Sequence, residues 1–196
     1  MKPNLYTLLY EGGIKVSKEL KRSYKAYPAW DYEKEEIDIN ENSKNGWQLI
    51  KGGCFHSVFE KDDSKKYIYK IDYNTDAIKK SLERERYIQM FEELGWEYIN
   101  STYNGWSYFR KEYDENSDAS EYEIYTDNHS YKEMLNRWCK IGKVVLVIEL
   151  IFALIYTFMA IMHLDIVMGI YSVLFWILFI WIKKGLNMMN MKMKKE

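Results

Sequence analysis

Cysteine is scarce in this sequence. Its 196 residues include two cysteines, Cys54 and Cys139, which are far apart and form no metal-binding spacing. Secreted domains that depend on disulfides carry a denser framework, so the sequence predicts a reducing compartment. A single disulfide between the two is the less favoured alternative.

An excess of charge of either sign is also missing. Lys and Arg total 28 and Asp and Glu total 29, which gives a formal net charge of −1. A general nucleic-acid binder carries a basic excess, so nucleic acid is not an expected partner. The first residues, MKPNLYTLLYEGG, hold only a short apolar run and lack a signal-peptide cleavage pattern. We therefore expect that the N-terminal part is not exported by a signal of its own.

Recognisable catalytic patterns are absent as well. The three histidines, His56, His129 and His163, have no His, Cys or carboxylate partner at a metal-ligand spacing. There is no glycine-rich phosphate loop and no nucleophile elbow, and Gly52–Gly53 is typical of a bulge or turn. The sequence predicts no catalytic residue, metal or cofactor. It favours a protein that is not an enzyme, with an uncharacterised membrane-bound enzyme as the weaker alternative.

Two long apolar runs lie near the C-terminus. They cover residues 144–163 and 166–182, and at about 1.5 Å per residue the first spans about 30 Å, the thickness of a hydrocarbon core. We predict a transmembrane hairpin over residues 144–183, with Asp165 capping the second helix. The alternative is a buried helical hairpin of a soluble protein.

Positive charge flanks both runs. The residues expected at the membrane interface are Arg137, Lys140, Lys143, Trp181, Lys183 and Lys184. A basic tail over residues 184–196 follows, whereas the turn between the runs has no Lys or Arg. The positive-inside rule then places both termini in the cytosol and the turn outside. The predicted location is the cell membrane, crossed twice, with the lipid bilayer as a partner.

Three residues within the apolar runs are charged, polar or small. Glu149 is costly in hydrocarbon, which favours either a functional polar site or a side chain that reaches the cytosolic headgroups or a partner within the helix pair. Gly169 and Ser172 offer a small-residue face on which the two helices could pack.

The polar N-terminal part contains two similar segments, residues 45–74 and 94–128. Each opens with a Gly-Trp pair, and each continues through alternating β-type runs separated by a polar turn. The pairs that mark the repeat are Gly46–Trp47 and Gly95–Trp96. The last Tyr-rich run ends near Asp72 in the first segment and near Asp127 in the second.

Helical patterns precede both segments, over about residues 32–44 and 75–94, and glycine suits the position that ends a helix. We therefore predict an α+β fold, with an α-β-β-β unit used twice over residues 28–128. The strands would form one antiparallel sheet with the helices on one face. Residues 129–143 would form a connecting helix that runs into the first apolar span.

The pattern resembles a known family. The residues that carry the resemblance are Gly46–Trp47, Phe59, Tyr69, Asp72–Tyr73, Gly95–Trp96, Phe109 and the ending Ile124-Tyr125-Thr126-Asp127. In order and spacing they are similar to domain of unknown function 2812, over roughly residues 23–128. The resemblance implies a bacterial protein with C-terminal membrane helices, often encoded beside PadR-like transcription regulators. It supplies no activity and therefore no catalytic residues.

The N-terminal segment, residues 1–27, fits that family less well. If it is helical, its cations Lys18, Lys21, Arg22 and Lys25 form one stripe that could contact anionic lipid. The alternatives are a solvated face or a strand that leads into the first repeat. The acidic stretch 31–41 could neutralise the stripe.

Two further patterns favour structure over function. Asp72 and Asp127 end equivalent runs and could pair as carboxylates, but turn or cap roles are favoured. The aromatic strands could stack bases, but their alternation favours burial against a helix.

The sequence thus favours a membrane-anchored cytosolic module with a binding or regulatory role. Its expected partner is a protein or a small hydrophobic ligand. The alternative is a small membrane protein of immunity or transport-accessory type that acts through its hairpin.

Overall fold

A computed structural model describes residues 6–11, 14–78, 82–125 and 127–195, with side chains from residue 19 onward. The chain divides into two compact units, an N-terminal unit (Met1–Thr126) and a C-terminal unit (Asp127–Glu196). The α+β class and the C-terminal pair of apolar helices agree with the prediction from the sequence.

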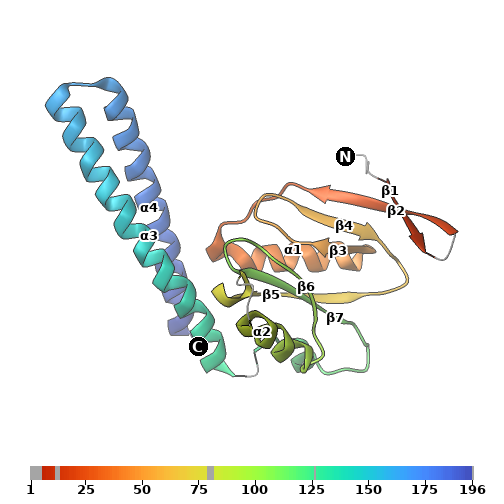
Figure 1. Ribbon diagram of the computed structural model, residues 1–196. Coiled ribbons are helices and arrows are strands. Elements are labelled where there is room, and N and C mark those ends of the chain that lie inside the picture. The colour runs from red at the N-terminus through yellow and green to blue at the C-terminus, as the bar shows by residue number, and fades with distance from the viewer. Residues whose placement is uncertain (1–5, 12–13, 79–81, 126, 196) are drawn as a thin grey trace. The chain divides into compact units, whose positions relative to one another are not determined.

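The N-terminal unit contains seven strands, two α-helices and three 3-10 turns among its described residues. In chain order they are β1 (Tyr6–Glu11), β2 (Ile14–Ser23), η1 (Ala29–Asp31), α1 (Tyr32–Lys44), β3 (Trp47–Lys51), β4 (Ser57–Lys61), β5 (Tyr67–Tyr73), η2 (Thr75–Ile78), α2 (Leu82–Glu92), β6 (Glu97–Ser101), β7 (Trp106–Glu112) and η3 (Ala119–Tyr122). The strands form two antiparallel sheets, ordered β1-β2-β4-β3 and β5-β7-β6 (Figure 1).

The duplication is present, but it begins one strand earlier than predicted. β2 pairs with β4, and β5 pairs with β7 in the same way, while β3 and β6 occupy the other edges of β4 and β7. The register shifts after Leu49 in β3 and after Tyr98 in β6, so even the bulge is repeated. The repeated unit is therefore β-α-β-β, and the predicted α-β-β-β frame was wrong because β5 opens the second unit.

The predicted last strand of the second repeat does not form. The Tyr-rich run there folds as η3 and an irregular segment, and Asp118 and Glu121 form a capping box at its start. The run follows β7 along the chain but cannot pair with it, because β7 is already paired with β5 on one side and β6 on the other. Tyr122 and Ile124 are nevertheless buried, so the run keeps its apolar contacts without joining a sheet.

The single predicted sheet is also wrong, because the strands form two sheets joined by a side chain. The Asn100 amide in β6 donates to the Gly52 carbonyl (2.9 Å) and accepts from the Gly52 amide (2.8 Å) just after β3. A Cβ on Gly52 would lie 2.5 Å from the Tyr108 ring, so only glycine allows this close approach.

Both α-helices of the repeat end in the same way. Gly46 (φ 76°) and Gly95 (φ 82°) adopt the left-handed conformation that terminates helices. Their amides donate to the carbonyls of Ser43 and Glu92, at 2.9 Å in both cases. The Gly-Trp pairs therefore mark equivalent helix ends, as the sequence predicts.

A lysine from the neighbouring strand closes each of these ends. Lys61 and Lys111 each donate to the carbonyl just before the glycine, at 3.0 and 3.2 Å. Each also lies over the tryptophan that follows the glycine, with 5.7 and 5.8 Å between the nitrogen and the ring centre of Trp47 and Trp96. One cation thus satisfies the helix end and covers the indole, and this shared packing explains the repeated sequence.

α2 packs on its sheet through two aromatic residues. Phe91 lies 4.4 Å from Phe109, centre to centre, and Tyr87 lies 6.0 Å from the same ring. Trp96, buried at the end of the helix, completes this core. Leu82, at the start of the helix, does not join this core and is 56% exposed.

α1 covers the free edge of β5. Three of its polar side chains, at helical spacing, bond to the backbone of alternate β5 residues. The pairs are Glu36 with Ile71, Asn40 with Tyr69 and Ser43 with Tyr67. Asn40 both donates to the Tyr69 carbonyl (2.9 Å) and accepts from the Tyr69 amide (2.8 Å). The helix therefore protects an edge that would otherwise be open to another strand.

The stripe of cations that a helix near the N-terminus would form does not arise, because Ile14–Ser23 is the strand β2. Lys21 donates to the Asn42 side chain (2.7 Å), and Lys25 is ion-paired with Asp38. The strand alternative was right, and part of the positive charge is neutralised by the acidic helix α1, as the sequence suggests. The Lys18 side chain lies outside the described residues.

The C-terminal unit is an antiparallel hairpin of two long helices, α3 (Asn128–His163) and α4 (Ile166–Lys195) (Figure 1). Asp127 caps α3 by accepting from the Ser130 amide (2.7 Å), and Asp165 caps α4 by accepting from the Val167 amide (2.7 Å). α3 continues without a break from the predicted connecting helix into the first apolar run.

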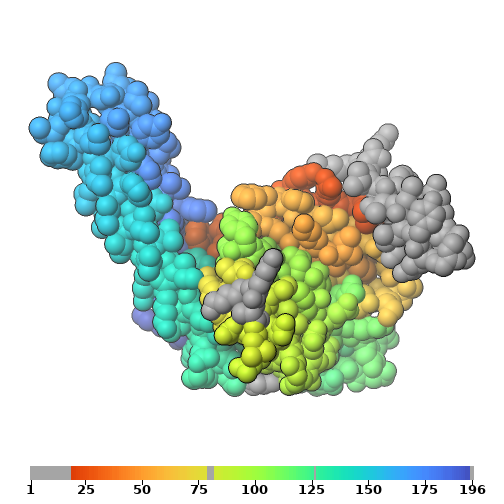
Figure 2. All heavy atoms as spheres, in the orientation of Figure 1, coloured from red at the N-terminus to blue at the C-terminus, as the bar shows by residue number. Residues whose placement is uncertain are grey.

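A polar cluster joins the two helices within the apolar part. The hydroxyls of Thr157 and Ser172 are 2.7 Å apart, and the Trp176 indole donates to Thr157 (3.1 Å). Ser172 therefore packs as predicted, whereas a Cβ on Gly169 would meet nothing within 4 Å. Figure 2 shows the side chains of the two helices in contact along the hairpin.

Candidate functional site

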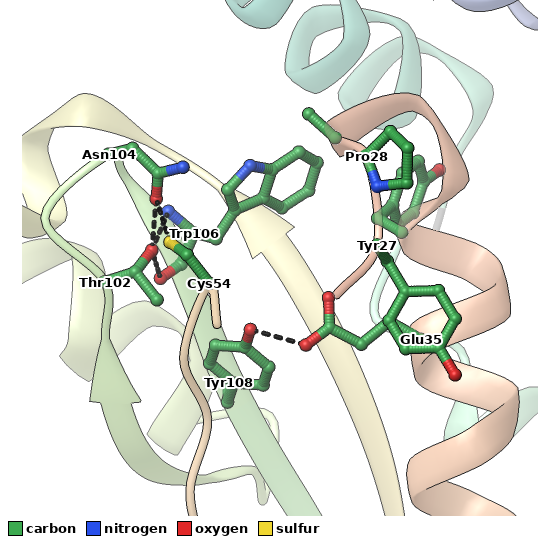
Figure 3. A pocket seen from close by; sticks show the side chains of 10 residues that line it. Tyr27, Pro28, Glu35, Cys54, Thr102, Asn104, Trp106 and Tyr108 are labelled. Carbon is green, nitrogen blue, oxygen red and sulfur yellow. Dashed lines mark hydrogen bonds between the residues drawn. The ribbon is translucent and has the colours of Figure 1, made fainter. Parts of the chain in front are cut away.

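A small cavity lies inside the N-terminal unit, between the start of α1 and two loops. Its volume is about 50 Å³, which is room for very few water molecules. Its ten lining residues are Tyr27, Pro28, Ala29, Tyr32, Glu35, Cys54, Thr102, Asn104, Trp106 and Tyr108 (Figure 3).

The duplication brings the walls of this cavity together. Cys54 is in the β3–β4 loop, and Thr102 and Asn104 are in the β6–β7 loop, which are equivalent loops of the two repeats. The Cys54 thiol is 3.4 Å from the Asn104 side-chain oxygen, so the loops touch at the cavity. α1 supplies Glu35 from its first turns and closes the opposite side.

The β6–β7 loop is held in one conformation. The Thr102 hydroxyl accepts from the Trp106 amide (3.2 Å) and donates to the Trp106 carbonyl (3.1 Å). Gly105 (φ 96°) makes the turn possible, since few other residues adopt this conformation. The cavity wall is therefore formed before any ligand arrives.

Glu35 is the acidic group of the cavity. Tyr108 donates to its Oε1 at 2.7 Å, and the second carboxylate oxygen points away from Tyr108 (Figure 3). Burial raises the pKa of Glu35 to about 7, although the bond from Tyr108 lowers it, and the nearby Asp38 raises it further. No Lys or Arg among the described side chains forms an ion pair with it.

Aromatic side chains line the cavity to which this carboxyl group belongs. Tyr32 and Trp106 are both buried and stack with 5.2 Å between ring centres and 27° between planes. Tyr73 supports Trp106 from another side at 5.0 Å. Burial and the Glu35 carboxyl raise the pKa of the Tyr108 hydroxyl, and burial raises that of the Cys54 thiol. Both groups therefore stay protonated at neutral pH.

Residues 31–148 match the model of a family described as protein of unknown function (DUF2812). The chain belongs to this family. No curated protein and no solved structure matches the chain. The match covers more than half of the chain and runs past Asn128, so the DUF2812 pattern includes the first part of α3 and both repeats except β2, the opening strand of the first.

In this DUF2812 chain the two aspartates that the sequence pairs have different structural roles. Asp72 is buried and accepts from the hydroxyls of Tyr87 (2.7 Å) and Tyr125, whereas Asp127 caps α3. The favoured cap role is confirmed for Asp127. Burial together with Asp72 raises the pKa of Tyr125, so this hydroxyl remains a donor to the carboxyl group.

The three histidines lie in different parts of the chain. His56 precedes β4 and lies 6.0 Å from the Tyr24 ring, and His129 is in the first turn of α3. His163 ends α3. Among the described residues no group of three or more His, Cys, Asp or Glu side chains could hold a metal ion.

The residues predicted for a membrane interface lie in the half of the DUF2812 hairpin that is away from its turn. Because α3 and α4 are antiparallel, Arg137, Lys140 and Lys143 come near the level of Lys183 and Lys184, opposite the turn. A contact of 3.8 Å between the Cys139 thiol and the Asn190 side chain belongs to this half. Trp181, which is 49% exposed, lies just before the two lysines.

Glu149 stands out within the hairpin. Its Oε2 atom is buried and has no hydrogen-bond partner among the residues that the structure describes. The predicted partner within the helix pair is therefore not seen for this oxygen. An unsatisfied carboxyl oxygen of this kind is costly, so the position is a second candidate site.

Sequence reasoning missed the cavity. Glu35 is one of several acidic residues at the start of α1, and Tyr108 is one of many strand aromatics. The two residues are 73 positions apart and meet only because α1 packs on β5, the strand that pairs with β7. Only the alignment of the two repeats, which places the Cys54 and Asn104 loops at equivalent positions, could have indicated the place.

Proposed function

We propose that the chain is a membrane-anchored module whose N-terminal unit acts on the cytosolic side. It binds a protein partner or a small ligand there, in a regulatory role rather than a catalytic one. The observation that supports a membrane anchor is the solvent exposure of the apolar hairpin. Both helices contain an apolar segment long enough to cross a membrane, and only 6% of each segment is buried within the protein. Exposed apolar surface on this scale is stable in lipid and not in water.

The charges of the hairpin support the direction of insertion. All six proposed interface residues lie in the half of the hairpin away from the turn, and the turn itself is Leu164–Asp165. Positive charge is retained on the cytosolic side, so both termini would be cytosolic. The two free cysteines suit the reducing side of the membrane.

Three observations support binding over catalysis. The cavity is far smaller than the several hundred Å³ of a usual substrate pocket. Its carboxyl group faces aromatic rings and hydroxyl groups, and none of the three histidines lines it. The remainder of the unit is filled by packed aromatic side chains, as in the α2 core.

Labelling of single cysteines tests the topology. In a chain whose two cysteines are replaced by serine, Asp165→Cys should react with a membrane-impermeant maleimide in intact cells. Asn116→Cys, in the N-terminal unit, should react only after the cells are opened. The proposal fails if Asn116→Cys is labelled first, or if the chain remains soluble after lysis.

A hairpin exchange tests where the function resides. The hairpin is replaced with an unrelated two-span anchor, and the phenotype of a deletion strain is used as the assay. We expect the exchanged chain to restore function at normal abundance. Loss of function with normal abundance would contradict the role assigned to the N-terminal unit.

One observation favours a second candidate function, in which the hairpin itself is active in transport or immunity. It is the buried, unpartnered oxygen of Glu149. For this candidate Glu149→Gln should abolish the phenotype while abundance stays normal, and the exchanged hairpin should fail. If Glu149→Gln retains full function, the second candidate is excluded.

A further inference from the structure

We propose that the cavity beside Glu35 binds the ammonium end of a primary amine. This inference rests on the proposed function, because it names the ligand class of the binding module. The occupant is the terminal group of an alkylamine, either a free small amine or the ethanolamine headgroup of a lipid. The argument follows from charge, wall chemistry and size.

The carboxyl group of Glu35 supplies the charge. One oxygen accepts from Tyr108 (2.7 Å), and the other has no hydrogen bond from a described residue. A partly desolvated carboxylate without a cation is unfavourable, and an ammonium group reduces this cost. The ammonium group has three donors and no acceptor, so it suits a free carboxylate oxygen.

The walls of the cavity suit a cation as well. The lining includes four aromatic residues, Tyr27, Tyr32, Trp106 and Tyr108, of which Figure 3 labels Tyr27, Trp106 and Tyr108. Ammonium groups are attracted to such rings within about 6 Å of their centres, and most strongly where water is excluded. An anion would meet the Glu35 carboxylate and has no basic side chain in the lining to hold it.

Size limits the ligand to a terminal group. A volume of about 50 Å³ holds a methylammonium-sized group but no whole metabolite. A divalent metal ion is a poorer fit, because it takes six or more oxygen ligands and Glu35 is the only carboxylate in the lining. The alkyl part of the amine would leave the cavity towards the solvent.

Among the titratable groups around the cavity, Glu35 is the one whose protonation changes near neutral pH. The other groups do not change charge in this range. They are Tyr108 from β7, Cys54 from the β3–β4 loop, Tyr27 from the segment before α1, and Asp38 from α1. The pKa values of Tyr108, Cys54 and Tyr27 are raised, so these groups stay uncharged, and Asp38 is ion-paired with Lys25. Amine binding therefore requires loss of the Glu35 proton.

The test uses the full chain in detergent micelles, with methylammonium chloride as the probe in a titration followed by NMR. Binding should saturate at about pH 8 and weaken by roughly tenfold for each pH unit below about pH 7, as expected for one proton released on binding. Glu35→Gln should weaken binding at least tenfold and remove its pH dependence. Glu33→Gln, an exposed neighbour outside the cavity, should change neither.

Several results would overturn the proposal. They are a lack of saturation by methylammonium, equal binding of methanol, or unchanged affinity and pH dependence in Glu35→Gln. Near-UV circular dichroism of Glu35→Gln must match that of the unaltered chain. If it does not, Tyr108→Phe is used instead; it is expected to move the onset of binding to higher pH, and an unmoved onset counts against the proposal.

Nanodiscs with and without phosphatidylethanolamine separate the two sources of the amine. If phosphatidylethanolamine competes with methylammonium, the site is assigned to the lipid headgroup. If the lipid does not compete, the site is assigned to a free amine. Both results support the proposal. If methylammonium does not bind but the exchanged hairpin still restores function, the amine site alone is wrong. If the topology or the exchange fails, the proposed function is wrong whatever the amine does.

Discussion

Glu35 couples the stability of the N-terminal unit to pH. Its folded pKa of about 7 is above its usual value, so between these two values the folded state binds more protons than the unfolded state. The resulting stabilisation is complete below the unfolded pKa and is lost as the pH rises through about 7. The ionised carboxylate then remains in the cavity without a cation from the chain.

Glu35→Gln should therefore stabilise the chain at high pH and not at low pH. We expect a gain of about 1–3 kcal/mol in the free energy of unfolding at about pH 8, reduced from the full linkage value because water reaches the carboxyl group. At about pH 4 the two chains should be equally stable. Denaturant unfolding of the full chain in detergent measures both, and a gain that is the same at both pH values would contradict the assignment.

The same residue marks the limit of prediction from sequence at this scale. Glu33 and Glu35 are both acidic residues near the start of an amphipathic helix, and nothing local distinguishes them. Glu35 differs from Glu33 in its hydrogen bond from Tyr108. Because Tyr108 is far away along the chain, local sequence patterns do not indicate this bond. The Gly-Trp pairs are the opposite case, because a positive φ followed by a buried ring is a local requirement that the residues themselves express.

At the scale of elements, α1 acts as a substitute strand. Its Glu36, Asn40 and Ser43 satisfy the backbone of β5 where another strand would pair. This arrangement explains why helix and strand boundaries could be predicted while sheet order could not. Alternation and glycine positions fix each element locally, but which edge a helix covers depends on side chains that also suit a solvated face.

Asn40→Ala tests how much the fold depends on the side chains of α1 that cover β5. It leaves both the amide and the carbonyl of Tyr69 unpaired, and we expect a loss of about 2–4 kcal/mol in the free energy of unfolding. Asn45→Ala is the matched control, since Asn45 bonds through its side chain only to the Glu41 carbonyl of its own helix. Its loss should stay below about 1 kcal/mol.

Amide hydrogen exchange places the effect within the fold. The Tyr69 amide should exchange much faster in Asn40→Ala, while amides of α2 should change only with global stability. Equal losses for Asn40→Ala and Asn45→Ala would show that the covered edge contributes little.

The hairpin offers a second prediction for an element. Thr157→Val removes the hydroxyl that contacts both Ser172 and the Trp176 indole, at nearly constant volume. Polar bonds between helices in lipid contribute about 0.6 kcal/mol on average and up to about 1.7 kcal/mol, so the loss should fall in this range. Gly169→Ala, which meets nothing, is the control and should cost nothing measurable. Thermal unfolding of the hairpin in nanodiscs compares the two.

At the scale of the whole molecule, the two units of the chain remove apolar surface from water in different ways. The N-terminal unit buries its aromatic residues in internal clusters, whereas the C-terminal unit leaves most of its apolar residues exposed. The change of composition near residue 128 predicted this division. A long apolar run is stable in lipid, whereas an alternating pattern of apolar and polar residues is stable in a folded unit that faces water. The phase of the duplication escaped prediction because β5 is equally regular as the end of one unit or the start of the next.

The N-terminal unit should therefore fold without the hairpin. Residues 1–126 contain both sheets and both helices that cover them, and the core around Phe109 comes entirely from this unit. We expect the fragment to be soluble, monomeric and cooperative in unfolding, with an NMR spectrum that retains the dispersed aromatic resonances of a packed core. The reciprocal fragment, residues 127–196, should remain in the membrane after an alkaline wash, since its surface is stable only in lipid. If residues 1–126 aggregate or lack cooperative unfolding while the full chain in detergent does not, the two units are one folding unit, and the hairpin has a structural role beyond that of an anchor.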